Sequence, residues 1–474
     1  MRMRNDPSTD PVVILGFGPA AMSAVDALRG VGYAGDIVVV TDGGSLPASP
    51  VLTSYYAAGA VDRESCFLWS ARDVEERGLT VVPHEPVARL DVAKRTVASE
   101  SGRTWRFSAC LVATGSSPRV DGAGALEACS PLTLRTVDDA EAFAAALGRA
   151  NANVLVSGTS MVALKAAEAC LKRHARVTVL GRSEHILKRA AHPLAAAHME
   201  TLVDMQGVNL ELGEKVAEAR TLPDGALGVR FAGEERARTF TAALQAHGMT
   251  PNIDFIADGD LEIDRGIVVD RFMQSSAPGV FAAGDVAQAP CLTGGAGIAG
   301  LWAEARAMGA VAGKSMAAYL GCTADRPEDR EYPGFLPANT IRVGRALFAS
   351  AGHVPEDALL ETPPLDSATG APRLDARRAC APGAAFDAAP ARCGALASDS
   401  ATGNDAARPI LKETGRRGVY TLKAYAPRAD GSLALTGFNM VALADGRGLF
   451  DSAADDIGAL RAEITRNALQ ARTT

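Results

Sequence analysis

The stretch that decides the fold is an apolar run and the turn after it, Val12-Val13-Ile14-Leu15-Gly16-Phe17-Gly18-Pro19-Ala20-Ala21. A short apolar run that ends in glycine and leads into alanine-rich residues predicts a buried strand, a turn and a helix. Gly16 permits the tight turn, Gly18 lets the backbone approach a pyrophosphate, and the small Ala21 lets the helix pack closely on the strand. With Pro19 and Ala20 opening the helix, the stretch predicts a phosphate-binding site at a helix N-terminus.

Composition excludes several classes of protein. The chain has 474 residues, enough for roughly two to four domains. Its net charge of −7 argues against a nucleic-acid-binding protein, which would carry a basic face. No apolar run reaches the length of a membrane span, and residues 1–11 are polar, so we expect a cytoplasmic protein.

Metal binding is not expected from the cysteines or histidines. The eight cysteines are scattered and no two have C-x-x-C spacing, which is typical of reduced, non-metal cysteines. His192 and His198 fall in a predicted helix and are expected at the surface or as caps, without carboxylates or cysteines at metal-ligand spacing.

A second buried strand, residues 36–41, ends at Asp42. An acidic residue about twenty positions after the glycines is the partner that a dinucleotide fold uses for the adenosine ribose. The alternative is an ordinary aspartate in the loop after a strand; the upstream turn favours the ribose role.

The strand–turn–helix unit occurs twice. Residues 110–115 first form another buried strand that ends in Ala113-Thr114-Gly115. Residues 154–163 then repeat the opening pattern around Gly158, and residues 175–180 supply the following strand. Two such units in one chain imply two bound dinucleotides.

The repeat departs from the usual pattern in ways that bear on its ligand. Ser160 replaces the second glycine, and a side chain there weakens the case for tight pyrophosphate binding. Gly181 and Arg182 end the second strand, where an acid would accept from the ribose. Arg182 offers a partner for a 2′-phosphate, which would favour NADPH, or it faces solvent; the sequence leaves both open.

A later motif belongs with the opening turn. Residues 279–283 are apolar and end in Gly284-Asp285, and the glycines of residues 294–297 predict the start of the next helix. Before it, residues 243–252 form a strand that ends in Gly248-Met249-Thr250-Pro251-Asn252.

The last third of the chain has a different pattern. Residues 339–349 alternate like one strand, and residues 355–408 read as a long insertion that contains Cys380 and Cys393. These could be a metal or redox pair, but two free thiols are favoured. Residues 419–441 predict a hairpin with an Asp430-Gly431 turn, and residues 457–468 a final helix.

Together these motifs resemble the flavoprotein reductases with two dinucleotide-binding domains, the family of glutathione reductase, ferredoxin and rubredoxin reductases and the flavin part of assimilatory nitrite reductase. The resemblance implies an α/β fold with two Rossmann-like domains and a C-terminal α+β interface domain. The implied boundaries are 1–133 and 256–325 for the FAD domain, 134–255 for the NAD(P) domain and 326–474 for the interface domain, with an insertion near 355–410. Residues 433–441, which contain Phe438-Asn439-Met440, are most similar to the nitrite-reductase-like and rubredoxin-reductase-like branch.

The resemblance also implies the cofactors, FAD and NAD(P)H, and the residues that bind them. Asp285 would bond the flavin's ribityl chain, and Trp302 would lie near the isoalloxazine or would be a core residue. The implied cofactor-binding residues are Gly16, Gly18, Pro19, Ala20, Ala21, Asp42, Val87, Ala113, Thr114, Gly115, Arg119, Gly158, Ser160, Met161, Arg182, Gly248, Gly284, Asp285 and Trp302. We assign no catalytic side chain, because hydride transfer to a flavin needs no acid–base group.

The missing cysteines decide the expected acceptor. Disulfide reductases of this family place a C-x4-C pair just after the first nucleotide motif, and residues 41–59 contain no cysteine. Cys66 has no clear pKa-lowering neighbour, so we expect a non-thiol acceptor such as ferredoxin, rubredoxin or an iron–sulfur subunit, with a quinone-like compound or oxygen also open. Two alternatives remain: the FAD subunit of a larger iron–sulfur complex such as phenylglyoxylate dehydrogenase, and a scaffold with a degenerate nicotinamide site. The chain would work as a homodimer or within a hetero-oligomeric complex.

Overall fold

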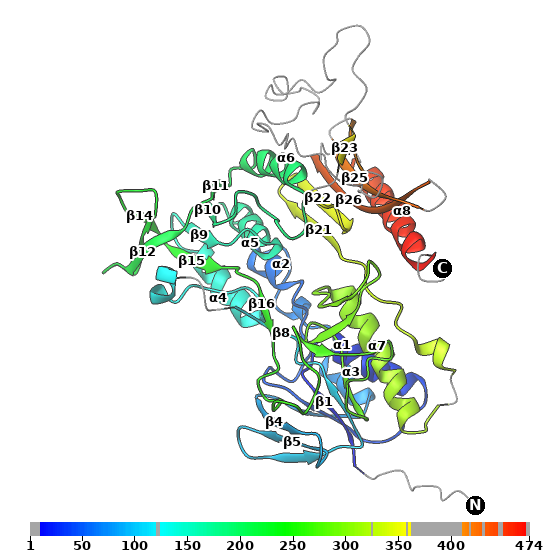
Figure 1. Ribbon diagram of the computed structural model, residues 1–474. Coiled ribbons are helices and arrows are strands. Elements are labelled where there is room, and N and C mark those ends of the chain that lie inside the picture. Colours follow the sequence, from blue (N-terminus) through cyan, green and yellow to red (C-terminus); the bar gives the residue numbers. More distant parts are fainter. Residues whose placement is uncertain are drawn as a thin grey trace, which may run out of the picture.

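The structure is a computed structural model that describes residues 10–119, 124–323, 326–356, 359–361, 410–416, 419–428, 432–443 and 449–470. Figure 1 shows three lobes. The first lobe holds β1 and α7, the inserted lobe holds β9 and α5, and the C-terminal lobe holds β26 and α8. The inserted lobe interrupts the first lobe along the chain, because β18 and α7 follow it in sequence but return to the sheet of β1.

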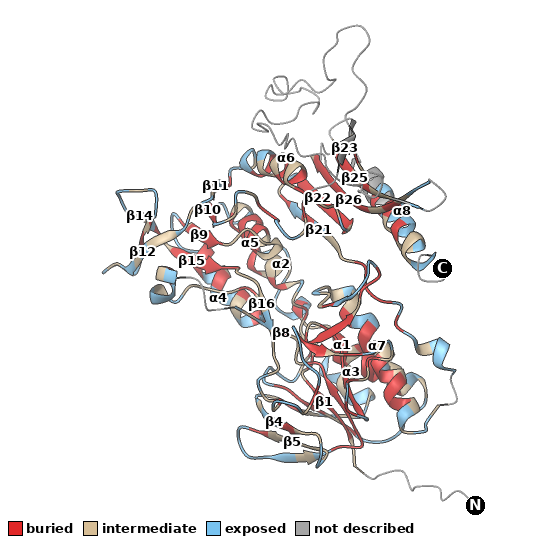
Figure 2. Cartoon of the chain, in the orientation of Figure 1, coloured by how far each residue is buried: buried red, intermediate tan, exposed pale blue. Residues whose placement is uncertain are grey.

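The first lobe is built on a five-stranded parallel sheet in the order β18-β7-β1-β2-β3. Its strands are β1 (Val12–Leu15), β2 (Ile37–Val40), β3 (Leu79–Val82), β7 (Ala109–Val112) and β18 (Val280–Ala282). All four residues of β1 are fully buried, as a central strand with both faces covered requires. Figure 2 shows this buried core continuing into the helices beside the sheet. The strands predicted at residues 12–15, 36–41 and 110–112 are confirmed.

Helices α1 (Pro19–Gly30) and α7 (Trp302–Tyr319) pack against each other with almost no side chain between them. A Cβ atom on Gly309 would overlap the carbonyl oxygen of Ala20, and one on Gly313 would overlap that of Ala24. The two backbones approach this closely only because α7 presents glycine at both contacts. The helix predicted to start near residues 294–297 begins instead at Trp302; those glycines lie in a loop and in β20 (Ala296–Gly297).

The inserted lobe repeats the same plan. Its four-stranded parallel sheet has the order β11-β10-β9-β15, with strands β9 (Asn153–Ser157), β10 (Arg176–Gly181), β11 (Asn209–Leu212) and β15 (Ala242–Gln245). Its helices are α4 (Val137–Leu147), α5 (Met161–Lys172) and α6 (Pro193–Asp204). The second strand–turn–helix unit predicted from the sequence is therefore confirmed, and the fold is α/β with two Rossmann-like units.

Two short antiparallel strands join the first lobe to the inserted lobe. They are β8 (Ser116–Pro118) on the way out and β16 (Met249–Pro251) on the way back. Beside them Thr114 Oγ1 donates to the Asn252 carbonyl oxygen at 2.8 Å, and Asn252 Nδ2 donates to the Thr114 carbonyl oxygen at 2.9 Å. The outgoing and returning chains therefore form one ribbon.

The C-terminal lobe is a six-stranded sheet packed on a helix. Its order is β21-β22-β26-β25-β24-β23, with strands β21 (Ala338–Val343), β22 (Ala346–Gly352), β23 (Leu359–Glu361), β24 (Ile410–Arg416), β25 (Val419–Pro427) and β26 (Leu433–Leu443), and the helix is α8 (Leu449–Gln470). The single strand expected over 339–349 is wrong: β21 and β22 form a hairpin that turns at Gly344, whose φ is +56°. The predicted hairpin strands β25 and β26 and the final helix are confirmed. The predicted Asp430-Gly431 turn, Cys380, Cys393 and most of the insertion lie outside the described residues.

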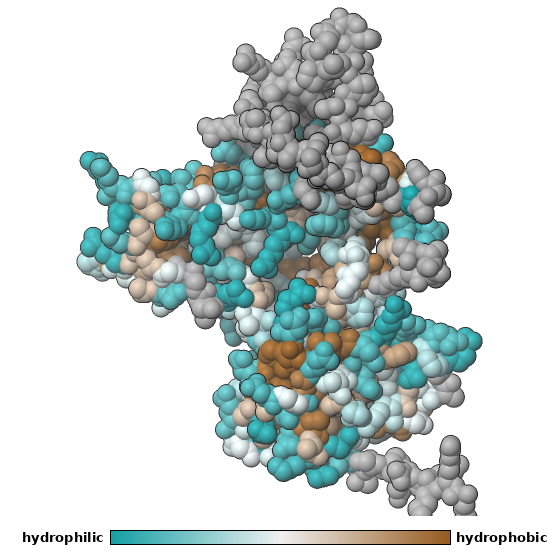
Figure 3. All heavy atoms as spheres, viewed as in Figure 1, coloured by the Kyte–Doolittle hydropathy of each residue, from teal (hydrophilic) through white to brown (hydrophobic). Residues whose placement is uncertain are grey.

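The remaining elements are shorter helices, strands and 3₁₀ turns outside the three main sheets. They are α2 (Thr53–Ala57), α3 (Ala71–Glu76), β4 (Val87–Asp91), β5 (Thr96–Ser99), β6 (Thr104–Arg106), β12 (Val216–Thr221), β13 (Leu227–Phe231), β14 (Arg238–Phe240), β17 (Ile267–Val268), β19 (Ala287–Pro290) and the short 3₁₀ turns Glu64–Cys66, Gly124–Cys129 and Pro327–Arg330. On the face in Figure 3, polar side chains cover most of the inserted lobe, and a hydrophobic area lies on the first lobe. None of the helices in the described ranges is both long and apolar enough to cross a membrane.

Helix α6 lies against the sheet of the C-terminal lobe. On this helix His198 is 4% exposed, and its ring stacks on Tyr420 of β25 at a centroid distance of 3.9 Å. The expectation of a surface position for His198 is therefore wrong, because α6 is covered by the C-terminal lobe. His192 does cap α6, since its Nδ1 accepts from the Leu194 amide at 3.3 Å.

This packing makes the junction of the two lobes sensitive to acid. Burial lowers the pKa of His198 to about 4. Between pH 6.5 and 4 the unfolded chain takes up a proton at this histidine that the folded chain does not, so the free energy of unfolding falls as the pH falls, by up to about 3 kcal/mol. We expect His198→Phe, which keeps a ring against Tyr420, to lose this part of the pH dependence. Thermal unfolding across that pH range checks the prediction; parallel curves for the two proteins would contradict it.

The helix contact gives a second prediction with an internal control. Gly309→Ala forces a methyl group into the Ala20 carbonyl oxygen and should destabilise the protein by about 1–3 kcal/mol. Gly458→Ala places the same methyl group on an exposed position of α8 with open space around it, and should stabilise the protein by up to about 1 kcal/mol. Urea unfolding gives the free energy of unfolding of both variants. If the two substitutions change it equally, α1 and α7 can move apart to accommodate the methyl group.

Candidate functional site

The first glycine turn is shaped by contact between two backbones. Gly16 has φ +92°, and a Cβ atom there would overlap the carbonyl oxygen of Ala113. The Gly16 amide also donates to the Val40 carbonyl oxygen at 2.8 Å, so the turn lies against the ends of both neighbouring strands. Only glycine fits this position, because both the backbone angle and the space exclude a side chain.

The start of α1 is open to an anion. Gly18 is the N-cap and makes no side-chain hydrogen bond, Pro19 is the first helical residue, and the first turn holds no acidic residue. A Cβ atom on Gly18 would meet nothing within 4 Å. The free amides and the positive end of the helix dipole suit a pyrophosphate, as in the sequence-based assignment of Gly16, Gly18, Pro19, Ala20 and Ala21.

The other predicted first-site residues gather around this turn. Gly284 has φ +84°, and a Cβ atom on it would lie 3.3 Å from the Cβ of Ala20. Asp42 is exposed just after β2, two residues beyond Val40. Thr114 and Gly115 follow β7 and bond the returning chain at Asn252, whose amide donates to the Gly115 carbonyl oxygen at 3.0 Å.

Asp285 has partners that the sequence did not indicate. Its Oδ2 accepts from Ser116 Oγ at 3.1 Å and from Arg135 at 3.0 Å. Oδ1 makes no hydrogen bond to the described residues, which leaves it able to accept from a ribityl hydroxyl. Arg135 is the residue that sequence reasoning missed here: it lies 150 positions away along the chain, and only the fold brings it to the carboxylate.

Three predicted residues are less closely tied to the turn. Val87 begins β4 in the small sheet β4-β5-β6, and Arg119 is exposed at the end of the outgoing chain, where its amide donates to the Gly248 carbonyl oxygen. Trp302 is the first residue of α7 and stacks under the guanidinium of Arg306 at 4.9 Å. Its buried Nε1 has no hydrogen-bond partner among the described residues. This N–H group is therefore able to donate to a bound cofactor.

The second glycine turn repeats the geometry of the first. Gly158 has φ +127°, and a Cβ atom there would lie 2.5 Å from the carbonyl oxygen of Ala246. Ser160, the N-cap of α5, accepts from the Ala163 amide at 3.3 Å and donates to the Ala246 carbonyl oxygen at 3.1 Å. Its hydroxyl therefore folds back onto the turn and stabilises it, at the cost of one helix amide that a phosphate could otherwise have used.

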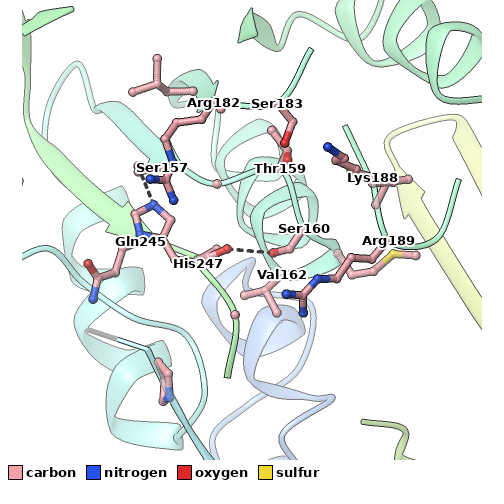
Figure 4. A pocket seen from close by; sticks show the side chains of 18 of the residues that line it. Ser157, Thr159, Ser160, Val162, Arg182, Ser183, Lys188, Arg189, Gln245 and His247 are labelled. Carbon is pink, nitrogen blue, oxygen red and sulfur yellow. Dashed lines mark hydrogen bonds between the residues drawn. The ribbon is translucent and has the colours of Figure 1, made fainter. Parts of the chain in front are cut away.

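The second turn opens into a cavity of about 800 Å³. The predicted residues Gly158, Ser160, Met161, Arg182 and Gly248 all line it. So do three cations that the sequence analysis did not single out: Lys188, Arg189 and Lys215. Figure 4 shows Arg182, Ser183, Lys188 and Arg189 around this cavity.

The carboxylate that NAD-binding folds place at the end of the second strand is absent from β10. At that position Gly181 has no side chain, and the methyl group of Thr159 fills the space that a Cβ would take. Among the described residues that line the cavity, Glu214 is the one acidic residue, and its Oε2 accepts from the Gly233 amide at 2.8 Å. Burial is the larger cause that lowers the pKa of His247, and the positive charge of Arg182 lowers it further. Its Nε2 bonds Ser157 Oγ at 2.8 Å.

None of the described cysteines forms a disulfide, and the described residues contain no cluster of His, Cys, Asp or Glu suitable for a metal ion. Cys66, the cysteine nearest the first motif, is buried, and burial raises the pKa of its thiol. It is therefore not an activated thiolate.

Comparison with known proteins places the chain in a family. Residues 10–309 match the pyridine nucleotide-disulphide oxidoreductases, and the chain belongs to that family. It is 28% identical over 60% of its length to a probable ferredoxin reductase of Castellaniella defragrans, covering 69% of that protein. It is 30% identical over 73% of its length to the NADH-dependent phenylglyoxylate dehydrogenase subunit epsilon of Aromatoleum evansii, covering 80% of it.

Solved structures share the fold over nearly the whole chain. The covalent complex of putidaredoxin reductase with putidaredoxin matches with a TM-score of 0.69 and 21% identity, covering 94% of this chain and 93% of that one. An engineered water-forming NADPH oxidase bound to NADPH, a five-substitution mutant of another enzyme, matches with a TM-score of 0.73 and 17% identity, covering 96% and 91%.

The chain is thus an FAD-dependent NAD(P)H oxidoreductase. Several of its relatives are named as ferredoxin reductases, which favours a reductase over a subunit of a larger complex. The boundaries of its domains and the roles of the individual cofactor-binding residues remain proposals.

The two glycine turns can be separated by experiment. Gly16→Ala should prevent FAD binding, because the methyl group would push β1 from β7. Gly158→Ala should leave the flavin bound and sharply weaken its reduction by NAD(P)H, because only the second turn is distorted. Visible absorbance of the purified protein reports the first effect, and anaerobic flavin bleaching the second. Flavin loss from Gly158→Ala would show that the two sites do not act independently.

Proposed function

We propose that this chain is an NADPH-dependent reductase that delivers electrons through FAD to an iron–sulfur protein. The observation that carries the choice of NADPH is the cavity beside β10, lined by Arg182, Lys188, Arg189 and Lys215. A 2′-phosphate is a dianion, and guanidinium and ammonium groups are the side chains that bind it. An unsubstituted ribose would instead need an acceptor at position 181, where this chain has glycine.

A spacing match supports the same proposal. The engineered NADPH oxidase carries alanine at one changed position, then alanine, arginine and serine at three consecutive positions that begin eighteen residues later, and arginine five residues beyond the serine. This chain has Ala163, then Gly181, Arg182 and Ser183, and then Lys188 at the same intervals. Ala163, Arg182 and Ser183 are the residues that the engineered enzyme has at these intervals, Lys188 has the charge of its arginine, and Gly181 lacks a carboxylate, as its alanine does.

The acceptor is proposed from the relatives. Several are named as reductases of ferredoxin-type proteins, and the putidaredoxin complex joins such a reductase to its partner. The buried position of Cys66, which raises the pKa of its thiol, agrees with a protein acceptor. We likewise propose a cytoplasmic location and assembly as a homodimer or in a hetero-oligomeric complex.

The chain's own residues would bind and orient the cofactors. The flavin supplies the hydride-accepting and electron-donating chemistry. The N-terminus of α1 would hold a pyrophosphate, and the N-terminus of α5 would hold the phosphates of the nicotinamide cofactor. Asp285, which Arg135 and Ser116 hold in place by hydrogen bonds, would accept from a ribityl hydroxyl.

The preference for NADPH is tested by anaerobic titration of the bound flavin with NADPH and with NADH. We expect NADPH to reduce it at much lower concentration. Arg182→Ala or Lys188→Ala should each raise the KM for NADPH by roughly ten- to a hundredfold, the effect of losing a hydrogen bond to a charged group, and should leave the KM for NADH almost unchanged. Lys94→Ala, which removes an exposed lysine of the first lobe, is the matched control. A wild-type protein that uses both cofactors equally would refute the preference.

The acceptor is tested separately. With NADPH as donor, the protein should reduce a [2Fe–2S] ferredoxin or a rubredoxin much faster than it reduces a disulfide or oxygen. Fast disulfide reduction would contradict the non-thiol acceptor. Co-elution of the native protein with iron–sulfur subunits on gel filtration would instead support the alternative of a complex subunit.

A further inference from the structure

The loop after β10 carries two of the four Lys and Arg residues described around the cavity. We call residues 183–192 the basic loop; it contains Lys188 and Arg189, which both line the cavity. It is not a regular element, and its middle residue Leu187 has φ +56°, a left-handed conformation that costs a side-chain-bearing residue roughly 1 kcal/mol or more. Such a conformation persists only if contacts around it hold the loop.

The inserted lobe holds the first half of the basic loop. The Ile186 amide donates to Glu200 Oε1 at 3.0 Å, and the Leu187 amide donates to the Thr159 carbonyl oxygen at 2.9 Å. Both partners belong to the lobe that also carries the loop. These bonds fix the chain just before Lys188.

The second half is held by the C-terminal lobe. Asn439 of β26 is 1% exposed, and its side-chain amide bonds the loop twice. Its Oδ1 accepts from the His192 amide at 2.7 Å, and its Nδ2 donates to the Ala190 carbonyl oxygen at 3.1 Å. Lys188 and Arg189 therefore lie between an anchor in the inserted lobe and an anchor in the C-terminal lobe.

The chemistry of asparagine fits this double contact. The loop presents one N–H and one C=O two residues apart, and a carboxamide offers one acceptor and one donor together. Aspartate would keep the contact to His192 but would set a carboxylate against the Ala190 carbonyl oxygen. Alanine would leave the buried His192 amide and the partly buried Ala190 carbonyl oxygen without this partner, which favours a relaxed loop.

We propose that Asn439 is a positioning residue for recognition of the nicotinamide cofactor, and that the C-terminal lobe thereby sets the selectivity for NADPH. Asn439 acts through the basic loop: it holds Lys188 and Arg189 where a 2′-phosphate would bind. The proposal rests on the proposed function, because it requires that these two cations contact that phosphate.

The test compares Asn439→Ala with Ser350→Ala, using NADPH and NADH as donors. Ser350 is buried directly opposite Asn439 on β22, so its substitution disturbs the same sheet without touching the basic loop. We expect Asn439→Ala to raise the KM for NADPH roughly tenfold or more, with kcat, flavin content and the KM for NADH nearly unchanged. Asn439→Asp should be intermediate. Ser350→Ala should leave the ratio of the two KM values as in the wild type.

A double-mutant cycle separates positioning from general destabilisation. In a Lys188→Ala, Arg189→Ala background, Asn439→Ala should add almost nothing to the KM for NADPH, because the side chains it positions are gone. Additive effects, or equal losses with both cofactors, would overturn the role of Asn439 while leaving the NADPH preference intact. If Lys188→Ala, Arg189→Ala itself leaves the KM for NADPH unchanged, the proposed function fails first and this inference fails with it.

Discussion

Main chain lying directly on main chain is the constraint on which the rest of this structure depends. Gly16 lies against the carbonyl group of Ala113, and Gly158 against that of Ala246, so each helix starts over the edge of its sheet with no side chain in between. The α1–α7 contact extends the same principle, because Gly309 and Gly313 bring α7 onto the backbone of α1. Gly284, beside Ala20, completes the cradle. At each glycine turn two stretches of backbone thus meet with no side chain between them, and a single methyl group would force them apart.

The parts of the fold that follow local rules could be predicted from the sequence. Buried strands read as apolar runs, and helices start where the glycine turns end, so both Rossmann-like units and the family resemblance were visible. The errors have local causes: Gly344 turns the chain within an alternating pattern, and the glycines at 294–297 serve a loop before α7 begins. The site residues that the sequence analysis missed have a non-local cause. Arg135, Lys188 and Arg189 reach their sites through tertiary contacts, and no spacing rule links Arg135 to Asp285 or Asn439 to Ala190.

The altered second turn is an intact structure with different chemistry. Ser160 does not project into the cavity as a bare obstacle but caps α5 and bonds the Ala246 carbonyl oxygen. Gly181 and Thr159 are complementary, since the threonine methyl occupies the space that a side chain at 181 would need. These substitutions remove a carboxylate and leave a positive cavity without breaking the sheet. A site adapted to a more negatively charged ligand needs a positive cavity on an intact sheet. A site that had lost its ligand would have no reason to keep the close fit between Gly181 and Thr159.

The ribbon of β8 and β16 has a mechanical consequence. Because Thr114 and Asn252 bond each other in both directions, the two chains that enter and leave the inserted lobe cannot slide past one another. They form a single stiff stalk instead of two independent tethers. The ion pair of Arg135 with Asp285, at 3.0 Å, adds a side-chain tie between the inserted part of the chain and the segment after β18.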